Sequence, residues 1–367
     1  MKISIVGAGI MGLGTAWALE RLGHQVTIFE QGPIPNPLAS SHDSHRLIRF
    51  PYGDKAGYMR MVGDAFAVWQ RLWADLGETL YCETGTLALA SGTTRWFRDS
   101  AEALAQAGHT IERLDAAALA QRFPLLRAES VAEGFYLPSG GVLLAGRILE
   151  ALARRLAGLG VELRLNTPVR SIDPDRGWVT LSDGGVVGAD AVLVAAGPWI
   201  ARLVPSLRRR VTPSRQILAY VEPPVSFAAA WRDMPMLLDI DAESGFYAVP
   251  PVAGTGLKFG DHRFVLGGDP DLDREARADE AESLLDSCRS RLRQGDRYQI
   301  TRLKTCFYTV EPNERFIVEP LGIAGWVMSP CSGHGFKFGP LLGSAVAGAI
   351  DSGEAGDITL WAAGETA

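Results

Sequence analysis

The sequence has few cysteines, and no two of them form a Cys-x-x-Cys pair. Its four cysteines are Cys82, Cys288, Cys306 and Cys331. A chain of 367 residues can bury a hydrophobic core without disulfide staples. The cysteine pattern therefore excludes a small disulfide-stabilised scaffold. It predicts a protein of a reducing compartment, the cytoplasm, and no metal ion is expected.

The sequence also lacks long apolar runs and concentrated positive charge. No apolar run approaches the roughly 20 residues that span a bilayer. The apolar N-terminus has no longer basic region and is interrupted by glycines, unlike a signal peptide. The formal net charge is -6, and the one basic run is Arg208–Arg210. Because binding to nucleic acids or anionic membranes depends on clustered Lys and Arg, we expect neither as a partner.

What the chain does have is the composition of an ordinary globular protein, with 47% hydrophobic and 21% charged residues. A length of 367 residues exceeds what one hydrophobic core usually organises, so two domains are expected. Composition alone leaves the function open.

The first 30 residues predict a β-α-β unit. Residues 2–6 and 25–30 are short β-branched runs, and residues 11–22 between them have a helical pattern. Such units build parallel sheets with right-handed crossovers. After a loop rich in Pro, Ser and His, apolar residues recur at helical spacing from Val62 to Leu76, which predicts an amphipathic helix.

Later segments return to the same pattern. We expect a helix that carries residues 148–159 and ends at Gly160, buried strands at 161–165, 191–195 and 326–329, and a terminal helix over residues 341–350. Between about 213 and 303 the pattern changes to strand-like pieces broken by Pro and Gly, with one charged helix from Arg274 to Arg293. This order predicts an α/β protein with a Rossmann-like nucleotide domain and an inserted, mainly antiparallel α+β substrate domain.

A glycine-rich turn follows the first strand and opens the first helix. In Gly7-Ala8-Gly9-Ile10-Met11-Gly12, Gly7 permits the tight turn, Gly9 lets a pyrophosphate approach the backbone, and Gly12 lets helix and strand pack closely. Glu30, at the end of the second strand, can accept hydrogen bonds from a ribose. The segment predicts an ADP-binding site, but FAD and NAD use the same device.

Several later segments resemble the monomeric sarcosine oxidase family, which includes N-methyltryptophan oxidase and pipecolate oxidase. They occur in family order along nearly the whole chain, and this joint order is more specific than any one motif. The segments are Ser40-Ser-His-Asp-Ser-His-Arg-Leu-Ile-Arg49, Ala196-Gly-Pro-Trp199, Gly256-Leu-Lys-Phe-Gly-Asp-His262, Lys304-Thr-Cys-Phe-Tyr-Thr309 and Ser332-Gly-His-Gly-Phe-Lys337.

This resemblance implies FAD as the cofactor and oxidation of a secondary amino acid, N-methylated or cyclic. Oxygen would be the electron acceptor, giving hydrogen peroxide and an imine that hydrolyses. It also implies a monomer with a discontinuous FAD-binding domain, residues 1–80, 141–212 and 307–367. The substrate domain would comprise residues 81–140 and 213–306.

The resemblance assigns catalytic roles to five residues. Arg49 and Lys337 match the positions that hold the substrate carboxylate, and Lys258 the position that activates oxygen. Tyr247 matches the family's aromatic residue that faces the substrate amine. His262 completes a Lys-x-x-x-His match with Lys258, and we expect the two side chains on the same face of one strand. Residue Asp261, before the histidine, stands where the family more often has an aromatic residue.

The resemblance also assigns the flavin contacts. His42 and Arg46 resemble the pair that flanks the flavin ring, and Cys306 sits where this family attaches the flavin through a thioether. Cys331 is the rival attachment point. The other expected cofactor contacts are Gly7, Gly9, Ile10, Met11, Gly12, Glu30, Val169, Gly197, Trp199, Gly333, Gly335, Phe336 and Lys337.

Two other functions remain as alternatives. One is a flavin dehydrogenase of the same fold that passes electrons to a quinone or a protein instead of oxygen. The other is a non-enzymatic nucleotide-binding or RNA-associated protein, against which the acidic charge and the absence of a basic, aromatic stripe count.

Overall fold

The N-terminal β-α-β unit forms as expected and belongs to a six-stranded sheet in the computed structural model, which describes residues 1–92, 94–240 and 245–365. The sheet order is β20-β21-β13-β1-β2-β9, and all neighbours are parallel except β20 with β21. The strands are β1 (Lys2–Val6), β2 (Gln25–Phe29), β9 (Glu162–Arg164), β13 (Ala191–Val194), β20 (Ile317–Leu321) and β21 (Gly325–Ser329). The expected strands at 161–165 and 191–195 thus join the nucleotide-type sheet.

Mutually packed helices accompany this sheet. The helix α1 (Ile10–Arg21) contacts α5 (Ala145–Gly158) and α9 (Gly339–Ser352). The helix α2 (Ala56–Leu76) also contacts α5 and α9. Glycines let α1 and α9 approach closely, since a Cβ on Gly343 would lie 2.6 Å from the backbone nitrogen of Thr15. A small antiparallel sheet, β10 (Val169–Asp173), β11 (Trp178–Leu181) and β12 (Val186–Gly188), packs through β11 against β13.

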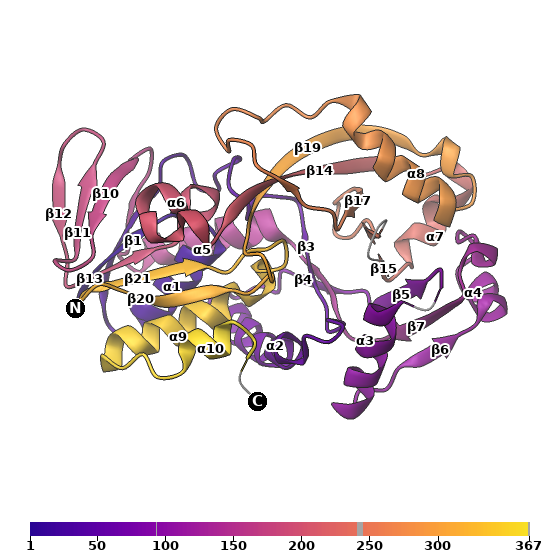
Figure 1. The fold of residues 1–367 in the computed structure, drawn as a ribbon, viewed down its shortest axis with the longest axis horizontal. Coiled ribbons are helices and arrows are strands. Elements are labelled where there is room, and N and C mark those ends of the chain that lie inside the picture. The colour runs from indigo at the N-terminus through magenta and orange to yellow at the C-terminus, as the bar shows by residue number, and fades with distance from the viewer. Residues whose placement is uncertain (93, 241–244, 366–367) are drawn as a thin grey trace.

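A second large sheet organises the rest of the molecule, as Figure 1 shows on its right-hand side. Its order is β18-β14-β17-β16-β15-β5-β7-β6, with β19 also paired to β14, and only β15 and β5 are parallel. The strands are β5 (Thr86–Ala90), β6 (Glu112–Leu114), β7 (Glu133–Leu137), β14 (Thr212–Glu222), β15 (Met236–Asp239), β16 (Phe246–Val249), β17 (Leu257–Asp261), β18 (Val265–Leu266) and β19 (Gln299–Val310). The expected mainly antiparallel sheet is therefore present.

Long strands connect the two parts of the molecule. In Figure 1, β14 and β19, both strands of the second large sheet, arch together over the top of the molecule and extend toward the first sheet. A third, short sheet carries β3 (Arg46–Ile48), β8 (Gly141–Leu143) and β4 (Tyr81–Glu83). The remaining helices are α3 (Arg95–Gln106), α4 (Ala116–Arg122), α6 (Ile200–Leu203), α7 (Ala228–Arg232), α8 (Glu282–Arg291) and α10 (Ile358–Ala362).

The charged helix expected from Arg274 to Arg293 is shorter than predicted. Only α8 is α-helical, preceded by a 3-10 turn over Ala278–Ala281. Arg277 is extended, and its backbone N–H donates to the Glu280 side chain, which starts the helical segment there. Upstream, the carbonyl of Glu275 accepts from Arg215 rather than from a helical N–H group. These side-chain bonds compete with helix formation.

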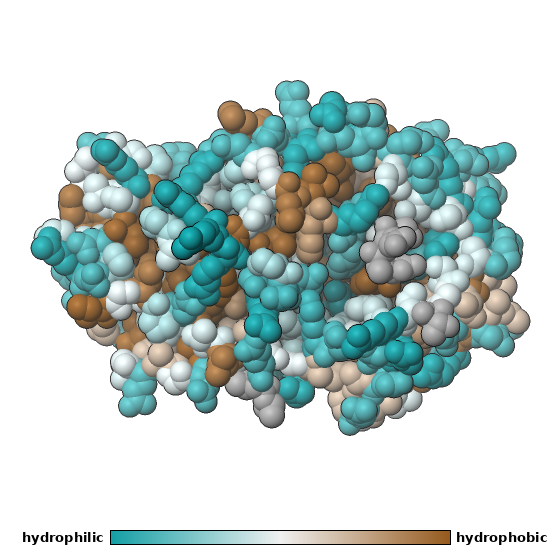
Figure 2. Space-filling model, in the orientation of Figure 1, coloured by the Kyte–Doolittle hydropathy of each residue, from teal (hydrophilic) through white to brown (hydrophobic). Residues whose placement is uncertain are grey.

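Surface character differs across the molecule. Figure 2 shows hydrophobic residues gathered in the left half and the centre of one face, whereas the right-hand part is mainly hydrophilic. In the described part of the chain, no helix is both long enough and apolar enough to cross a bilayer.

Candidate active site

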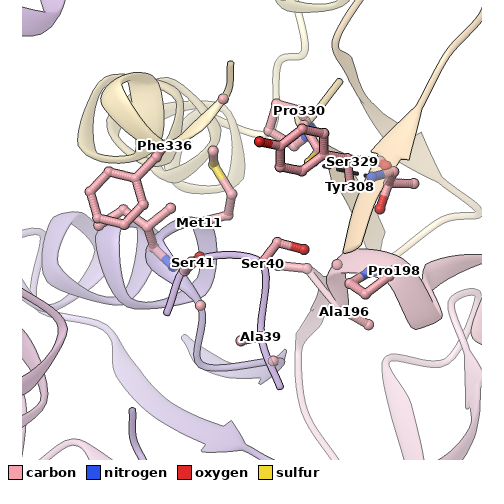
Figure 3. Close-up of a pocket in the computed structure, with 18 of the residues that line it drawn as sticks. Met11, Ala39, Ser40, Ser41, Ala196, Pro198, Tyr308, Ser329, Pro330 and Phe336 are labelled. Carbon is pink, nitrogen blue, oxygen red and sulfur yellow. Dashed lines mark hydrogen bonds between the residues drawn. The ribbon is translucent and has the colours of Figure 1, made fainter. Parts of the chain in front are cut away.

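One cleft extends from the six-stranded sheet to the second large sheet. Residues at the carboxyl ends of β1, β2, β13 and β21 line one end of it, and residues of β15, β16 and β17 line the other. In open α/β sheets, ligands bind outside the carboxyl ends of the parallel strands. Figure 3 shows its middle, where Ser40 and Ser41 lie on one loop, Met11 at the start of α1, and Tyr308 and Pro330 across from them.

The glycine-rich turn takes the geometry that its sequence requires. Gly7 has φ +104°, and a Cβ there would lie 2.5 Å from the carbonyl oxygen of Ala195. A Cβ on Gly12 would lie 1.9 Å from the carbonyl oxygen of Gly7, so Gly12 serves helix–strand packing. Gly9 is the N-cap of α1 and offers no capping side chain; the Ile10 N–H donates instead to the Ser41 hydroxyl at 3.0 Å, and the residues of this helix N-terminus line the cleft. Such a terminus favours an anionic phosphate.

Glu30 lies in the same end of the cleft. Its carboxylate accepts hydrogen bonds from the backbone N–H of Ala8 at 2.9 Å and of Gly32 at 3.0 Å, and from the Asn36 side chain at 2.8 Å. These donors hold the carboxylate in place, and it retains lone pairs for further hydrogen bonds. Val169 lines the cleft nearby.

The turn before α9 forms the opposite wall. Ser332 and Gly333 have positive φ angles of 40° and 78°, and a Cβ on Gly333 would lie 2.9 Å from the ring of Tyr308. A Cβ on Gly335 would lie 1.7 Å from the carbonyl oxygen of Pro330. The turn therefore needs its glycines for backbone packing, and it brings Phe336 to the cleft in Figure 3.

Arg49 and Lys337 meet in the substrate part of the cleft. The two side chains belong to residues that are 7% and 3% exposed. In the described ranges, no carboxylate forms a salt bridge with either of them. Burial lowers the pKa of Arg49 and, helped by the nearby guanidinium, holds the pKa of Lys337 well below its usual value. Two buried cations that lack a described counterion form a site suited to an anion.

Tyr52 links these two cations. The Nζ of Lys337 donates to the Tyr52 hydroxyl at 2.9 Å and to the carbonyl of His334 at 2.8 Å. The Arg49 guanidinium carbon lies 4.6 Å from the centre of the Tyr52 ring, a cation–π distance. The indole N–H of Trp69 donates to the Lys337 carbonyl at 2.7 Å. The packing of these aromatic residues thus fixes both cations.

Lys258 lies on β17 and is 1% exposed, although it lines the cleft. Its Nζ donates to Asp43 Oδ2 and to the carbonyl of His45, both at 2.9 Å. Desolvation lowers the pKa of Lys258 to about 8, and Asp43 opposes that shift. The lysine is therefore paired, and its partner is an acid that sequence reasoning did not single out.

Tyr247 and His262 line the cleft close to these lysines. Their ring centres lie 6.3 Å apart. The expectation that His262 shares a strand face with Lys258 is wrong in detail, because β17 ends at Asp261 and the histidine follows it. Desolvation in the cleft, and then the charges of Arg49 and Lys337, lower the pKa of His262, although the residue is open to solvent on one side. The imidazole is therefore neutral at ordinary pH.

His42, Arg46 and Cys306 form a group beside the cleft. Arg46 lines it, forms a salt bridge with Asp43, and lies with its Nη2 3.8 Å from the Cys306 sulfur. The ring of His42 points instead to Lys304, whose Nζ lies 3.2 Å from its Nδ1. Of the two candidate attachment cysteines, Cys331 lines the cleft, whereas Cys306 is buried behind Arg46 and Ser40.

Most of the expected site residues converge on this one cleft. Within the described ranges, Gly12, His42 and Cys306 are outside its lining, for the reasons above. The expected residues that line it are Gly7, Gly9, Ile10, Met11, Glu30, Arg46, Arg49, Val169, Gly197, Trp199, Tyr247, Lys258, His262, Gly333, Gly335, Phe336 and Lys337. Tyr52, Trp69, Asp43 and His45 were missed. The only available signal was that Asp43 and His45 stand inside the family-like segment 40–49.

A flavin dinucleotide fits the residues that line the cleft. The hydroxyls of Thr309 and Ser329, both on lining residues, are buried and have no hydrogen-bond partner in the described structure. Buried polar groups normally find partners, so such orphans point to a missing polar molecule. Gly9 and Ser41 also line the cleft, and a Cβ on Gly9 would lie 3.0 Å from the Ser41 hydroxyl. The cleft therefore contains a helix N-terminus that can bind a phosphate, a carboxylate that can accept hydrogen bonds from a ribose, and unpaired hydroxyl groups.

The sequence matches the family model for FAD dependent oxidoreductases over residues 2–349. Among curated proteins, it is 26% identical over 354 residues to a monomeric sarcosine oxidase of Bacillus sp. (strain B-0618), covering 94% of this chain and 90% of that protein. It is 28% identical over 357 residues to an N-methyl-L-tryptophan oxidase of Salmonella arizonae, covering 94% and 92%.

Solved structures share the fold. NikD, described as an unusual amino acid oxidase essential for nikkomycin biosynthesis, superposes with a TM-score of 0.81 at 22% identity, covering 98% of this chain and 93% of that one. L-proline dehydrogenase from P. horikoshii gives a TM-score of 0.84 at 18% identity, covering 99% and 96%. At these identities the likeness concerns the fold alone.

Proposed function

The chain belongs to the FAD dependent oxidoreductase family, and from this premise we propose that it oxidises a secondary amino acid, N-methylated or cyclic, with oxygen as the electron acceptor. The observation that carries the proposal is the pair of buried cations, Arg49 and Lys337, in the same cleft as the dinucleotide-type turn. Sarcosine oxidase and N-methyltryptophan oxidase, to which the chain is similar, are named for such substrates. Overall, the amine gives up two electrons and two protons to become an imine, and oxygen takes up both to become hydrogen peroxide.

The cleft supplies distinct regions for the parts of FAD. The amides at the start of α1, with Gly9 and Glu30, would hold the ADP part, and the turn from Gly333 to Phe336 would face the ring. When bound, FAD accepts two electrons from the substrate C–N bond and delivers them to oxygen. The N-terminus of the short 3-10 turn and α9 would place positive backbone dipole near the ring.

Arg49 and Lys337 would hold the substrate carboxylate. Charge-assisted hydrogen bonds are about twice as strong as neutral ones, and water exclusion strengthens them further. The carboxylate would also compensate the two desolvated cations, and raise the pKa of Lys337 toward its usual value. Fixing one end of the substrate orients its C–N bond, which lowers the entropic part of the barrier.

The side chains of His262 and Tyr247, near the expected position of the substrate amine, are uncharged. Desolvation lowers the pKa of His262, and burial raises the pKa of Tyr247. At ordinary pH both residues are therefore uncharged and can accept or donate hydrogen bonds. Because the two cations repel a protonated amine, the substrate amine is expected to react in its neutral form.

Lys258 would serve the oxygen half of the reaction. A cation near the site where oxygen takes up electrons stabilises the negative charge that develops there. Lys258 lines the cleft and is held by two hydrogen bonds. Loss of Lys258 should slow reoxidation of the enzyme by oxygen but should not slow its reduction by the amino acid.

The flavin would be attached covalently through Cys306. In support, the cysteine stands in the family-like segment 304–309, and its sulfur lies 3.8 Å from Arg46 Nη2. Arg46 also lines the cleft, next to the space assigned to the ring. Cys331 is the competing site because it lines the cleft itself.

The chain would divide into an FAD-binding domain, residues 1–80, 141–212 and 307–367, and a substrate domain, residues 81–140 and 213–306. The two large sheets follow these ranges closely, although β19 crosses the boundary after residue 306 and β14 begins at Thr212, one residue before the substrate domain. All four cysteines are free, which supports a reducing compartment such as the cytoplasm. We also propose that the enzyme acts as a monomer.

The proposal is tested by an oxygen-consumption screen of the purified protein. Sarcosine, N-methylated larger amino acids, pipecolate and proline are offered in turn, and peroxide is measured in parallel. At least one substrate should consume oxygen and release an equal amount of peroxide. A protein that stays colourless after refolding with FAD, or that consumes no oxygen with any of these substrates, would contradict the proposal.

A further inference from the structure

We propose that Asp43 is a positioning residue for the oxygen half of the reaction: its carboxylate fixes Lys258 in the cleft and keeps it cationic. The inference rests on the proposed function for the role of Lys258. It concerns a different residue, however, and the ion pair itself can be measured without turnover. Asp43 was assigned no role by the sequence.

The geometry that supports the proposal is a salt bridge with both partners buried. Asp43 is 3% exposed, and its Oδ2 lies 2.9 Å from the Nζ of Lys258. The second acceptor for Nζ is a neutral carbonyl, that of His45. Asp43 therefore supplies the one full negative charge among the described hydrogen-bond partners of this ammonium group.

Asp43 is itself held from several sides, so it can act as a fixed charge. Its Oδ1 accepts from the backbone N–H of Ser44 at 2.9 Å and from the hydroxyl of Tyr220. Tyr220 lies opposite Lys258 in the β14–β17 register. The two neighbouring strands thus present a hydroxyl and an ammonium group to the same carboxylate, which comes from the loop before β3.

The charges around Lys258 show what Asp43 must overcome. Arg46 and Lys304 both lie near the carboxylate, and both lower the pKa of Lys258 by repulsion, as desolvation does. Asp43 is the largest influence in the opposite direction. Its own pKa is held well below the usual range by Lys258 and then Arg46, so it stays ionised.

The guanidinium of Arg302 lies 4.0 Å from the centre of the Tyr220 ring and adds a further cation at the edge of this cluster, and the pKa of His42 is lowered by desolvation and then by Lys304. His45, Tyr220 and Tyr247, which also face the cluster, are uncharged. The pKa of His45 is about 3 and that of Tyr220 is about 12, so neither carries charge at ordinary pH. Tyr247 also stays protonated, because burial raises its pKa. With these groups uncharged, removal of the Asp43 charge would leave Lys258 facing two cations in a desolvated place. The lysine would then lose its proton near neutral pH.

The test uses the small number of lysines in the chain. They are Lys2, Lys55, Lys258, Lys304 and Lys337, so NMR of holoenzyme labelled with ¹³C at lysine Cε should give few signals. The Lys258 signal is assigned by its loss in Lys258→Met. Its titration midpoint is then compared between the wild type and Asp43→Asn. The expected result is a midpoint at least one pH unit lower in the variant.

Reoxidation of the reduced enzyme by oxygen provides the second measurement. At pH 8, close to the wild-type midpoint, Asp43→Asn should be at least about fivefold slower than the wild type, and the difference should shrink at pH 6, where the lysine regains its proton. The double variant Asp43→Asn/Lys258→Met should be no slower than Lys258→Met alone. The rate of reduction by the amino acid serves as an internal reference and should change less than threefold.

Tyr220→Phe is the matched control. It removes a hydrogen bond from the same carboxylate but leaves the charge, so the Lys258 midpoint should stay unchanged or rise slightly. Should Asp43→Asn fold poorly, Asp43→Ser provides a smaller uncharged side chain with the same expected shift. An unchanged midpoint, or faster reoxidation in the variant, would overturn the proposal. If the wild type oxidises no amino acid, the proposed function fails, yet the titration still reports the ion pair.

Discussion

The ammonium group of Lys337 donates a 2.9 Å hydrogen bond to the hydroxyl of Tyr52. The ring of the same tyrosine lies beneath the guanidinium of Arg49, 4.6 Å from its central carbon. One aromatic side chain therefore sets the spacing between two buried cations that come from distant parts of the sequence.

Loss of either cation should weaken binding of the substrate carboxylate. Arg49→Leu and Lys337→Met each remove a charge-assisted interaction in a desolvated site, at a cost of about 3 kcal/mol, or roughly a hundredfold in kcat/KM. Steady-state kinetics and titration with acetate, followed by the flavin absorbance, measure the effect. Arg71→Gln on the exposed surface of α2 is the control and should behave as the wild type. Unchanged acetate binding in both cation variants would contradict the assignment.

Tyr52→Phe should act more mildly and on the substrate side only. The phenyl ring keeps the cation–π contact with Arg49, but Lys337 loses its hydroxyl acceptor. A lost hydrogen bond to a charged group costs about 1.5 kcal/mol, so KM should rise about tenfold with kcat nearly unchanged. Steady-state kinetics decide it, and a fall in kcat at constant KM would show that Tyr52 does not act through the carboxylate site.

The sequence predicted the local elements and the dinucleotide turn because these depend on nearby residues. The strands predicted at 2–6 and 25–30, and the spacing of Gly7, Gly9 and Gly12, follow from steric rules that act within one β-α-β unit. The charged helix from Arg274 was overextended, because side-chain bonds from Arg215 and Glu280 override its local pattern.

The site residues were predicted only where they stand in a recognisable segment. Arg49, Lys258 and Lys337 were found through the family resemblance, and the structure places them in one cleft. Tyr52 and Trp69 were missed, since a buried aromatic residue on a helix or loop carries no mark of what it contacts. Contacts across hundreds of residues, such as Trp69 to the Lys337 carbonyl, depend on how the elements pack.

The attachment cysteine can be decided by two substitutions. If Cys306 is bound to the flavin, Cys306→Ser should release all flavin on acid precipitation, and Cys331→Ser should retain it in the pellet. Absorbance of the supernatant and the mass of the denatured protein measure this. The reverse pattern would move the attachment to Cys331, which already lines the cleft.

Gly9→Ala tests the close approach of the cofactor to the start of α1. Gly9 lines the cleft, and the added Cβ would lie 3.0 Å from the hydroxyl of Ser41, another lining residue, while the backbone at Gly9 is already extended and suits alanine. Flavin affinity should fall at least tenfold, about 1.4 kcal/mol, with little change in the stability of the flavin-free protein. Gly348→Ala in α9, where a Cβ meets nothing within 4 Å, is the control. Equal flavin affinity in the two variants would show that no ligand passes close to Gly9.

The lowered pKa of Lys337 predicts a pH dependence of stability. In the folded protein its pKa lies well below 10.5, because of desolvation and then the charge of Arg49. Between the folded pKa and the unfolded value of about 10.4, the unfolded chain binds more protons than the folded one, so stability rises with pH by up to about 1.4 kcal/mol per unit. Lys337→Met removes this contribution. The variant should therefore be at least as stable as the wild type at pH 7, and the stability of the wild type should increase relative to that of the variant as the pH rises to 10.

Urea unfolding at pH 7, 8.5 and 10 measures the difference, with the exposed Lys2→Met as control. Acetate, by binding the charged form, should reduce the wild-type slope. Parallel pH curves for the wild type and Lys337→Met would show that the lysine has an ordinary pKa and, with it, an undetected counterion.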